Sequence, residues 1–439
     1  MGLKIVIAKE NAKFEKRVAV SPDTVKKLKA LGALIMIEKG AGDAASFTDD
    51  MFKAAGGTIA KGSKDLYNGA NIVLKVQAPS NDELSLIPQG ALVIAMLAPY
   101  ANETLLKALA KHKIDAFSME LVPRITRAQS MDVLSSQSNL AGYKSVLDAA
   151  EHFTRAFPMM MTAAGTIPPA KVFVMGAGVA GLQAIATARR LGAVVTATDV
   201  RPAAKEQVES LNASFVAVEN EEFKQAETAG GYAKEMSADY QKQQAALVAE
   251  HIAKQDIVIT TALIPGRPAP KLITGAMVKS MKPGSVIVDL AVESGGNVDG
   301  SKLDNIVVQN GVKIVGHANV PSRLSTDASA LYARNLLNLL NLIIDKDSGK
   351  LTIDWDDDII KGIAITKAGK IVNPNFAKTK SATPPAKKAP DKKTPAKKAS
   401  TKKAPAKKAP AKKSTASKAA PKKTAAKKTT TKTTPKKKG

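Results

Sequence analysis

The sequence contains no cysteine. This absence excludes disulfide bonds, thiolate metal sites and a cysteine nucleophile. Histidine is scarce as well, because the 439 residues include only four. No two of the four stand at the spacing typical of metal ligands, and they are His112, His152, His251 and His317. We therefore expect no metal chemistry.

Long hydrophobic runs are also missing. The longest apolar stretches, such as residues 91–101, fall well short of the roughly 20 residues that a membrane-spanning helix needs. The amino terminus lacks the longer apolar run and the small-residue cleavage site of a secretory signal peptide. We expect a cytoplasmic protein.

Acidic residues are almost absent from the last part of the chain. Residues 381–439 hold 21 of the 65 Lys and Arg residues and a single acid, Asp391, so this stretch carries a charge of +20. The remaining +6 of the total +26 is ordinary for a soluble protein. The stretch repeats AKKAP-like units and has no aromatic residue, so it cannot offset the entropy of ordering. We expect a disordered tail.

Strand and helix patterns alternate along the first 380 residues. The apolar run LKIVIA (3–8) predicts a buried strand, and SPDTVKKLKALG (21–32) predicts a helix with Ser21 as N-cap and Gly32 as stop. Such alternation is typical of a parallel sheet with helices on both faces. We predict an α/β protein with two Rossmann-like, doubly wound parallel-sheet domains, a cleft between them and the disordered tail.

A long helix predicted over residues 135–157 is a natural connector between the two domains. The Rossmann domain then covers residues 135–322. The last helix, residues 326–344, leads back to the first domain, which is therefore discontinuous and covers residues 1–134 and 323–380.

One glycine motif carries the clearest chemistry. Gly176, Gly178 and Gly181 fit G-x-G-x-x-G between an apolar strand and an Ala-rich helix. The first glycine permits a tight turn, the second lets the backbone approach a pyrophosphate, and the third allows close helix–strand packing. The free N–H groups of the helix favour the phosphates. The motif predicts dinucleotide binding rather than a merely structural turn.

The residues after the next strand bear on the form of the dinucleotide. Asp199 ends that strand, and a carboxylate there accepts hydrogen bonds from ribose hydroxyls and repels a 2′-phosphate. Arg201 follows two residues later and could receive that phosphate instead. We favour NAD(H) over NADP(H).

No clear catalytic base stands out. Oxidation of an alcohol or an amine needs a base for the proton that leaves with the hydride. The candidates are Lys75, His112, Glu293 and His317. His112 lies among lysines and is better interpreted as a solvated helix residue, and His317 as a structural hydrogen-bonding group.

Two loops are unusually polar or flexible. The first crowds polar groups before the long helix, namely Arg124, Arg127, Gln129, Asp132, Ser135, Ser136 and Gln137. It is either a lid that orients a carboxamide or a ribose, or a plain capping loop with Asp132 or Ser135 as N-cap. The second, residues 227–236, combines Gly230-Gly231 with Tyr232, which favours hinge motion around an aromatic plug.

Several long segments point to one family, among them RAQSMDVLSSQSNLAGY, FPMMMTAAGTIPPAKVFVMGAGVAGLQAIATARRLGA, ETAGGYAKEM, TTALIPGRPAP and VGHANVPSR. They resemble the NAD(H)-binding component of proton-translocating NAD(P) transhydrogenase over essentially all of residues 1–376. The resemblance implies a homodimer that binds NAD(H) between two Rossmann-like domains. It implies hydride transfer to NADP⁺ on a beta subunit, coupled to proton movement through a separate membrane subunit. The chain would then be peripherally associated with the inner membrane through these partners.

The resemblance also assigns site residues. The nicotinamide-side loop falls on Arg124, Gln129, Asp132 and Ser135. The mobile closing loop falls on Gly231, Tyr232 and Met236. The remaining cofactor contacts fall on Gly176, Ala177, Gly178, Val179, Gly181, Asp199, Val200, Arg201 and Leu263. Hydride passing directly between two nicotinamide rings moves no proton at the reacting carbons, which agrees with the missing base.

Two features leave alternatives open. Alanine dehydrogenase resembles the chain at Arg17 and Lys75, its substrate-binding positions, but the strand at 91–99 lacks its catalytic His, and Glu293 stands in place of an Asp. The tail departs from the transhydrogenase pattern and resembles histone-H1-type tails. Its charge predicts salt-sensitive binding to nucleic acid or anionic lipid, unless it is only a solvated tail.

Overall fold

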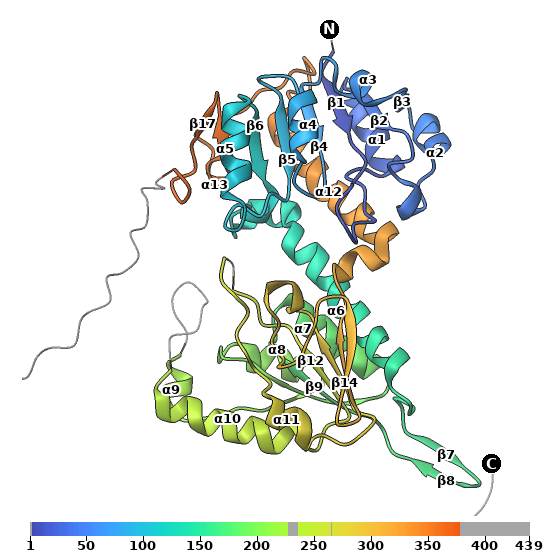
Figure 1. Ribbon diagram of the computed structural model, residues 1–439, viewed down its shortest axis with the longest axis vertical. Coiled ribbons are helices and arrows are strands. Elements are labelled where there is room, and N and C mark those ends of the chain that lie inside the picture. Colours follow the sequence, from blue (N-terminus) through green and yellow to red (C-terminus); the bar gives the residue numbers. More distant parts are fainter. Residues whose placement is uncertain (1, 227–235, 265, 378–439) are drawn as a thin grey trace, which may run out of the picture. The chain divides into compact units, whose positions relative to one another are not determined.

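Two sheets form the framework of the chain in the computed structural model, which describes residues 2–226, 236–264 and 266–377 (Figure 1). Residues 1–380 form one compact unit, and residues 381–439 are a second unit that lies outside the described residues. The prediction of a disordered tail is therefore not tested by the structure.

The first sheet has the strand order β17-β16-β6-β5-β4-β1-β2-β3. Its strands β1 to β6 run parallel, and β16 and β17 add an antiparallel edge. The strands are β1 (Lys4–Ile7), β2 (Leu34–Glu38), β3 (Thr58–Ala60), β4 (Ile72–Leu74), β5 (Leu92–Ala95), β6 (Asp115–Ser118), β16 (Ala364–Lys367) and β17 (Lys370–Ile371). The central strands β4 and β5 are buried on both faces, as a parallel sheet covered by helices requires.

Helices cover both faces of this sheet. On one face α1, α12 and α13 pack with Ile5 and Ile7, and on the other α3, α4 and α5 pack with Val6. As predicted, Ser21 caps α1, and Gly32 follows it with a φ of +82°. The helices of this part are α1 (Pro22–Ala30), η1 (Asp43–Ala45), α2 (Asp49–Ala54), α3 (Ser63–Tyr67), α4 (Asn81–Leu86), α5 (Glu103–Lys111), η2 (Met119–Leu121), α12 (Ser325–Ile343) and α13 (Asp358–Ile363).

The second sheet has the order β11-β10-β9-β12-β13-β15-β14, with β14 antiparallel at one edge. In both sheets the chain starts at a central strand, proceeds to one edge and then returns to the other side. This is the doubly wound α/β arrangement that the sequence predicted. The strands are β9 (Lys171–Met175), β10 (Val194–Thr198), β11 (Ser214–Phe215), β12 (Ile257–Thr260), β13 (Val286–Asp289), β14 (Asn305–Gln309) and β15 (Val312–Gly316).

Helices also cover both faces of the second sheet. Helices α6, α7 and α8 share a core with Val172 and Val174, and α10 and α11 pack with Phe173 on the opposite face. The helices of this part are α6 (Val133–His152), α7 (Val179–Arg190), α8 (Ala204–Ser210), α9 (Glu221–Lys224), α10 (Ala238–Ile252), α11 (Gly275–Ser280), η4 (Val292–Ser294) and η5 (Val320–Leu324).

The connecting helix differs from its predicted bounds. We predicted a helix over 135–157, but α6 begins at Val133 and ends at His152. Phe153 takes an extended conformation at the C-cap, and a hairpin that the sequence did not predict follows, formed by β7 (Met160–Thr162) and β8 (Gly165–Ile167). Its strand residues are all exposed, so no period-2 burial pattern marks it. Within the described ranges, no helix is both long and apolar enough to cross a membrane.

Candidate nucleotide-binding site

Strands β9 and β12 lie side by side where the winding of the second sheet reverses. Met175 and Thr260 are register partners, so Gly176 and Thr261 leave the sheet next to each other. Doubly wound sheets bind ligands outside the carboxyl ends of the strands at this switch point. The predicted glycine motif therefore lies at the edge where a ligand is expected.

The three glycines of the motif have different surroundings. Gly176 has a φ of +103°, which a residue with a side chain rarely adopts. A Cβ on Gly181 would lie 1.8 Å from the carbonyl oxygen of Gly176, whereas a Cβ on Gly178 would meet nothing within 4 Å. Gly178 is also the N-cap of α7, and its side-chain-free position leaves the first N–H groups of that helix open to an anion. This geometry fits a dinucleotide pyrophosphate.

Asp199 fixes the turn from the neighbouring strand. Its Oδ2 accepts a hydrogen bond from the N–H of Ala177 at 2.7 Å. Arg201 supplies the other donors to the carboxylate, with its backbone N–H and Nε at 2.9 Å from Oδ1 and Nη2 at 3.0 Å from Oδ2. These four donors occupy about all the acceptor positions of a carboxylate. Val200, between the two, is 62% exposed.

The remaining predicted cofactor contacts lie on two loops. The loop after β12 is held by Asn297, whose side chain accepts from the N–H of Ala262 at 3.0 Å and donates to its carbonyl at 2.9 Å, and this leaves Leu263 55% exposed. Met236 is half-buried just before α10, and its carbonyl accepts from Gln241. Gly231 and Tyr232 lie outside the described residues.

The predicted nicotinamide-side loop is the 3₁₀ turn η3 (Thr126–Met131) and the start of α6. Asp132 is the N-cap of α6 and accepts from the backbone N–H of Ser135 at 2.9 Å and from its hydroxyl at 2.5 Å. Capping is therefore one role of this pair. By contrast, Arg124 and Gln129 are exposed, and neither side chain makes a hydrogen bond to another described residue. Both are free to bind a ligand.

Helix α6 connects this loop to the glycine turn. It crosses α7 so closely that a Cβ on Gly142 would lie 2.1 Å from the carbonyl oxygen of Ala180, the second residue of α7. Asn139 also donates to Gln183 of α7 at 3.3 Å. Ten residues of helix separate Asp132 from Gly142, which is about 15 Å along the axis. One rigid element therefore holds both groups of predicted residues.

Lys75 and its partners occupy the switch point of the first sheet, after β4. Lys75 is 1% exposed, and its Nζ lies 2.8 Å from Glu83 and 3.6 Å from Glu10. Burial raises the pKa of Glu10 to about 7, although the charge of Lys75 opposes this shift. As a candidate base, Lys75 is thus held as a paired ammonium group.

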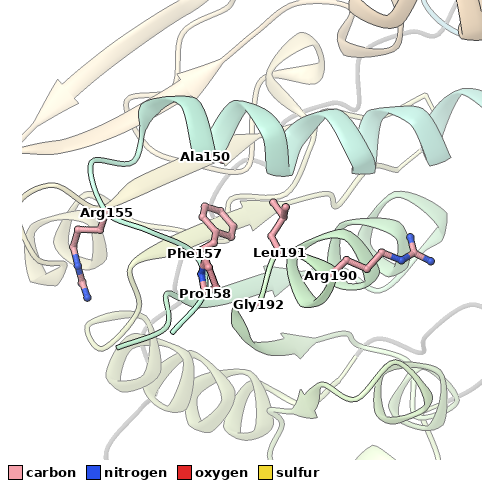
Figure 2. Close-up of a pocket in the computed structure, with 7 residues that line it drawn as sticks. All are labelled: Ala150, Arg155, Phe157, Pro158, Arg190, Leu191 and Gly192. Carbon is pink, nitrogen blue, oxygen red and sulfur yellow. The ribbon is translucent and has the colours of Figure 1, made fainter. Parts of the chain in front are cut away.

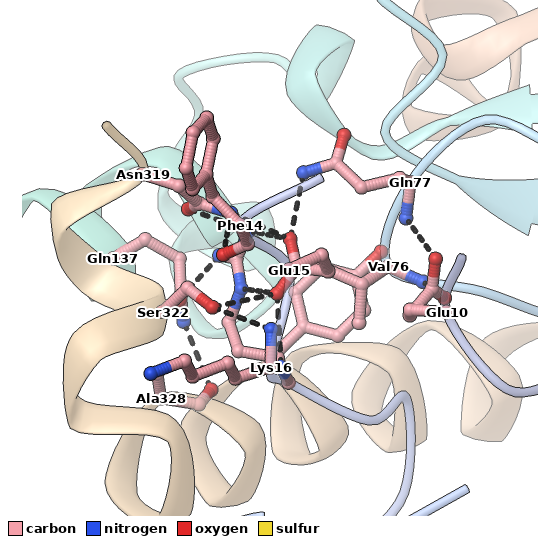
Figure 3. A network of polar contacts seen from close by, with 12 residues as sticks. Glu10, Phe14, Glu15, Lys16, Val76, Gln77, Gln137, Asn319, Ser322 and Ala328 are labelled. Atoms are coloured by element: carbon pink, nitrogen blue, oxygen red, sulfur yellow. Dashed lines mark hydrogen bonds and ion pairs between the residues drawn. The ribbon is translucent and has the colours of Figure 1, made fainter. Parts of the chain in front are cut away.

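Arg17 is tied into the neighbouring network drawn in Figure 3. It forms a two-pronged ion pair with Glu15, at 2.8 Å from Nε and 2.6 Å from Nη2, and it donates to Gln137 at 2.8 Å. Burial would raise the pKa of Glu15, but the hydrogen bonds and charge of Arg17 outweigh it and lower the pKa to about 2. Asn319 and Ser322 donate to the same carboxylate.

The other candidate bases have structural surroundings. His112 is the C-cap of α5, and burial lowers the pKa of His317, whose ring lies 6.1 Å from that of His152. Burial raises the pKa of Glu293. In the part of the chain that the structure describes, no group of three or more His, Asp or Glu residues could hold a metal ion.

An open hollow of about 550 Å³ lies elsewhere on the second sheet (Figure 2). Arg190 and Gly192, at the end of α7, contribute to it, whereas the glycine turn lies at the start of that helix. Arg155, which also lines it, is paired with Asp256 at 3.2 Å. The hollow is thus separate from the candidate site.

Comparisons with known proteins point to one family. Models of the alanine dehydrogenase/PNT N-terminal and C-terminal domains match residues 6–141 and 145–374. An NAD(P) transhydrogenase alpha subunit of Rhodospirillum rubrum is 57% identical over 377 residues, which cover 85% of this chain and 98% of that protein. The solved transhydrogenase from Sinorhizobium meliloti is 52% identical, with a TM-score of 0.74, and covers 85% of this chain and 100% of its own. A solved L-alanine dehydrogenase is 25% identical, with a TM-score of 0.70, over 85% of this chain and 98% of its own.

Proposed function

Because this chain belongs to the alanine dehydrogenase/NAD(P) transhydrogenase family and is similar to transhydrogenase alpha subunits along its first 380 residues, we propose that it is the NAD(H)-binding subunit of a proton-translocating transhydrogenase. In this role it holds NADH while hydride passes to NADP⁺ on a beta subunit. Separate membrane subunits couple this transfer to proton movement, and they keep the chain at the inner membrane. The observation that carries the proposal is the rigid connection, through α6, of a pyrophosphate turn to a loop with two free polar side chains.

Each group of residues has a defined task. The turn at Gly176–Gly181 and the start of α7 bind the pyrophosphate, and Leu263, Val200 and Met236 line the nucleotide. Arg124 and Gln129 donate to the carboxamide and fix the ring, with Asp132 and Ser135 shaping the loop beneath them. Bound NAD(H) supplies the hydride. No base is needed at the reacting carbons, so orientation to within contact distance is what the chain provides.

Asp199 sets the preference for NAD(H). A ribose can hydrogen-bond to its carboxylate only when Arg201 gives up the two positions held by its side chain. A 2′-phosphate in the same place would meet a carboxylate that is 7% exposed and fixed by the turn. Tyr232 and Gly231, outside the described residues, complete the proposal as a closing loop that excludes water.

Fluorescence titration tests the nucleotide preference. We expect the purified chain to bind NADH more tightly than NADPH by at least about tenfold, since charge repulsion at Asp199 costs more than about 1.4 kcal/mol. With the beta subunit added, hydride should exchange between NADH and an NADP analogue. A preference for NADPH would contradict the assignment of Asp199.

Alanine dehydrogenase is the alternative activity. Arg17 and Lys75, its two substrate-binding positions, are both paired with carboxylates of the chain itself. We therefore expect no NAD-dependent oxidation of alanine. Turnover of alanine by the isolated chain would instead favour this alternative.

The exposed hairpin supports a homodimer. Met159 and Met161 are 59% and 78% exposed on a two-stranded ribbon that stands away from the second sheet (Figure 1). Exposed apolar groups of this kind mark interaction sites, and an isolated ribbon is only marginally stable in water. We propose that a second copy of the chain covers it.

Sedimentation tests the dimer. Replacing Met159, Met160 and Met161 by Gln should convert the dimer to monomer at micromolar concentration. Leu34→Gln, which changes an equally exposed residue on β2, should leave the dimer intact. A triple variant that sediments as wild type would contradict the proposal.

The basic tail is proposed to bind polyanions, either nucleic acid or anionic lipid near the membrane subunit. Its charge of +20 predicts affinity that falls steeply with salt and carries little sequence preference. The full chain and a form ending at Lys380 should be compared on duplex DNA and on vesicles of anionic lipid. Equal binding by the two forms would contradict a role of the tail, and the DNA and vesicle arms distinguish the two partners.

A further inference from the structure

Two asparagines of α12 hold the turn η3 from a distant part of the chain. The carbonyl oxygen of Ser130 accepts hydrogen bonds from Nδ2 of Asn335 at 2.8 Å and from Nδ2 of Asn338 at 3.0 Å. Three residues apart, the two amides lie on the same face of the helix. Ser130 directly follows Gln129, the exposed side chain assigned to the nicotinamide. Both lone pairs of one carbonyl in the loop are thus fixed by α12.

Asn335 also reaches the first turn of α6. Its Oδ1 accepts from the hydroxyl of Ser136 at 2.8 Å, so the same amide connects Ser130 to Ser136 across the Asp132–Ser135 cap. Asn335 is 7% exposed, and a buried amide is retained only where its hydrogen bonds are made. The contact fixes the loop relative to the helix that leads to the glycine turn.

A third attachment comes from α13. Arg127 makes two contacts to Asp357, at 2.6 Å and 2.9 Å, and Asp357 in turn caps α13 through the N–H of Ile359. Arg127 is 48% exposed, so the pair adds little stability. Its fork geometry nevertheless restricts the orientation of the turn. By itself η3 has little support, since a 3₁₀ turn has weaker hydrogen bonds than an α-helix.

We propose that Asn335 and Asn338 are positioning residues for hydride transfer, which act by holding the Ser130 carbonyl so that Gln129 is presented in one conformation. The inference rests on the proposed function, because it concerns the loop that orients the nicotinamide. A small displacement of such a loop lowers the rate of transfer much more than it weakens binding, because the pyrophosphate and ribose contacts are elsewhere.

Asn338→Leu tests this role, since it keeps the size of the side chain and removes the donor at a half-buried position. Asn338→Gln retains an amide donor, and Asn341→Leu changes an exposed residue one turn further along α12 that makes no such contact to the described loop. In the full chain with its beta subunit, N338L should lower kcat for hydride exchange about tenfold, with the Kd for NADH changed less than about twofold. N338Q should recover most of the rate, and N341L should match wild type. Asn335→Leu should act in the same direction.

A second measurement needs no nucleotide. Hydrogen exchange of the amides of residues 126–132 should be faster in N338L than in wild type or N341L, because the turn has lost one attachment. Unchanged exchange together with an unchanged rate would overturn the inference, as would a loss of NADH affinity equal to the loss of rate. Absence of hydride exchange in the wild-type chain would instead refute the proposed function itself.

Discussion

The glycines of one motif are constrained by different neighbours, and the sequence motif alone does not separate them. Gly181 faces the carbonyl oxygen of Gly176, whereas Gly178 faces open space. A methyl group at the first position collides with backbone, while the same group at the second can obstruct only a ligand. The two positions therefore separate folding from binding.

We expect Gly181→Ala to lower the free energy of unfolding by about 1–3 kcal/mol, as overpacking does, and to weaken NADH binding as well. Gly178→Ala should leave stability within about 0.5 kcal/mol of wild type and still weaken NADH binding, by about tenfold or more, because the methyl group occupies the approach to the turn. Chemical denaturation and fluorescence titration of both variants provide the comparison. Wild-type affinity in G178A would argue against a pyrophosphate at this turn.

At the scale of elements, α6 has more than the connecting role that its position in the sequence suggests. The sequence indicated its existence, but not that Gly142 lets it contact the backbone of α7, since a lone glycine within a helix can have several causes. The same holds for Asn335 and Asn338, whose spacing marks a helix face but not which loop it meets. Such contacts depend on tertiary structure, and here they join residues more than 190 positions apart.

Gly142→Ala should separate α6 from α7 and so affect two properties at once. The added methyl group would lie 2.1 Å from the Ala180 carbonyl, so the helices must move apart. We expect a loss of about 1–3 kcal/mol in stability and a fall in the rate of hydride exchange. Leu134→Ala, at an exposed position of α6, is the control for a simple change in helix composition. If G142A and L134A behave alike in the exchange assay, then α6 does not link the loop to the turn.

Across the whole molecule, local patterns predicted most of the fold. Buried strands, the cap at Ser21 and the strand–turn–helix around Gly176 follow from short stretches of sequence, and the structure has them. The hairpin β7–β8 was not predicted, because all its strand residues are exposed and carry no alternation. Nor did the sequence show that Arg201 is bound to Asp199, since both an ion pair and a phosphate contact suit an arginine at that position.

Two glutamates of the buried network give the stability of the molecule opposite pH dependences. The lowered pKa of Glu15 affects stability only in acid, below its unfolded value of 4.5 and down to about 2. The raised pKa of Glu10 means that the folded chain keeps a proton between pH 4.5 and 7 that the unfolded chain loses. The contribution of Glu10 to the free energy of unfolding therefore decreases as pH rises through this window.

Glu10→Gln should remove that dependence. Between pH 4.5 and 7 the free energy of unfolding of the wild type should fall by about 3 kcal/mol more than that of the variant, from a shift of about 2.5 pKa units. Urea denaturation at several pH values measures the difference. Parallel profiles for the two proteins would show that Glu10 titrates near its usual pKa in the folded chain.

The continuous helix between Asp132 and Gly142 has one more consequence. Deleting a single residue from that stretch would rotate its two ends relative to each other by about 100° and shorten it by about 1.5 Å. The cap and the crossing with α7 could then not both be kept, whatever residues remained. The number of residues in this part of the chain is thus under tighter constraint than most of their identities.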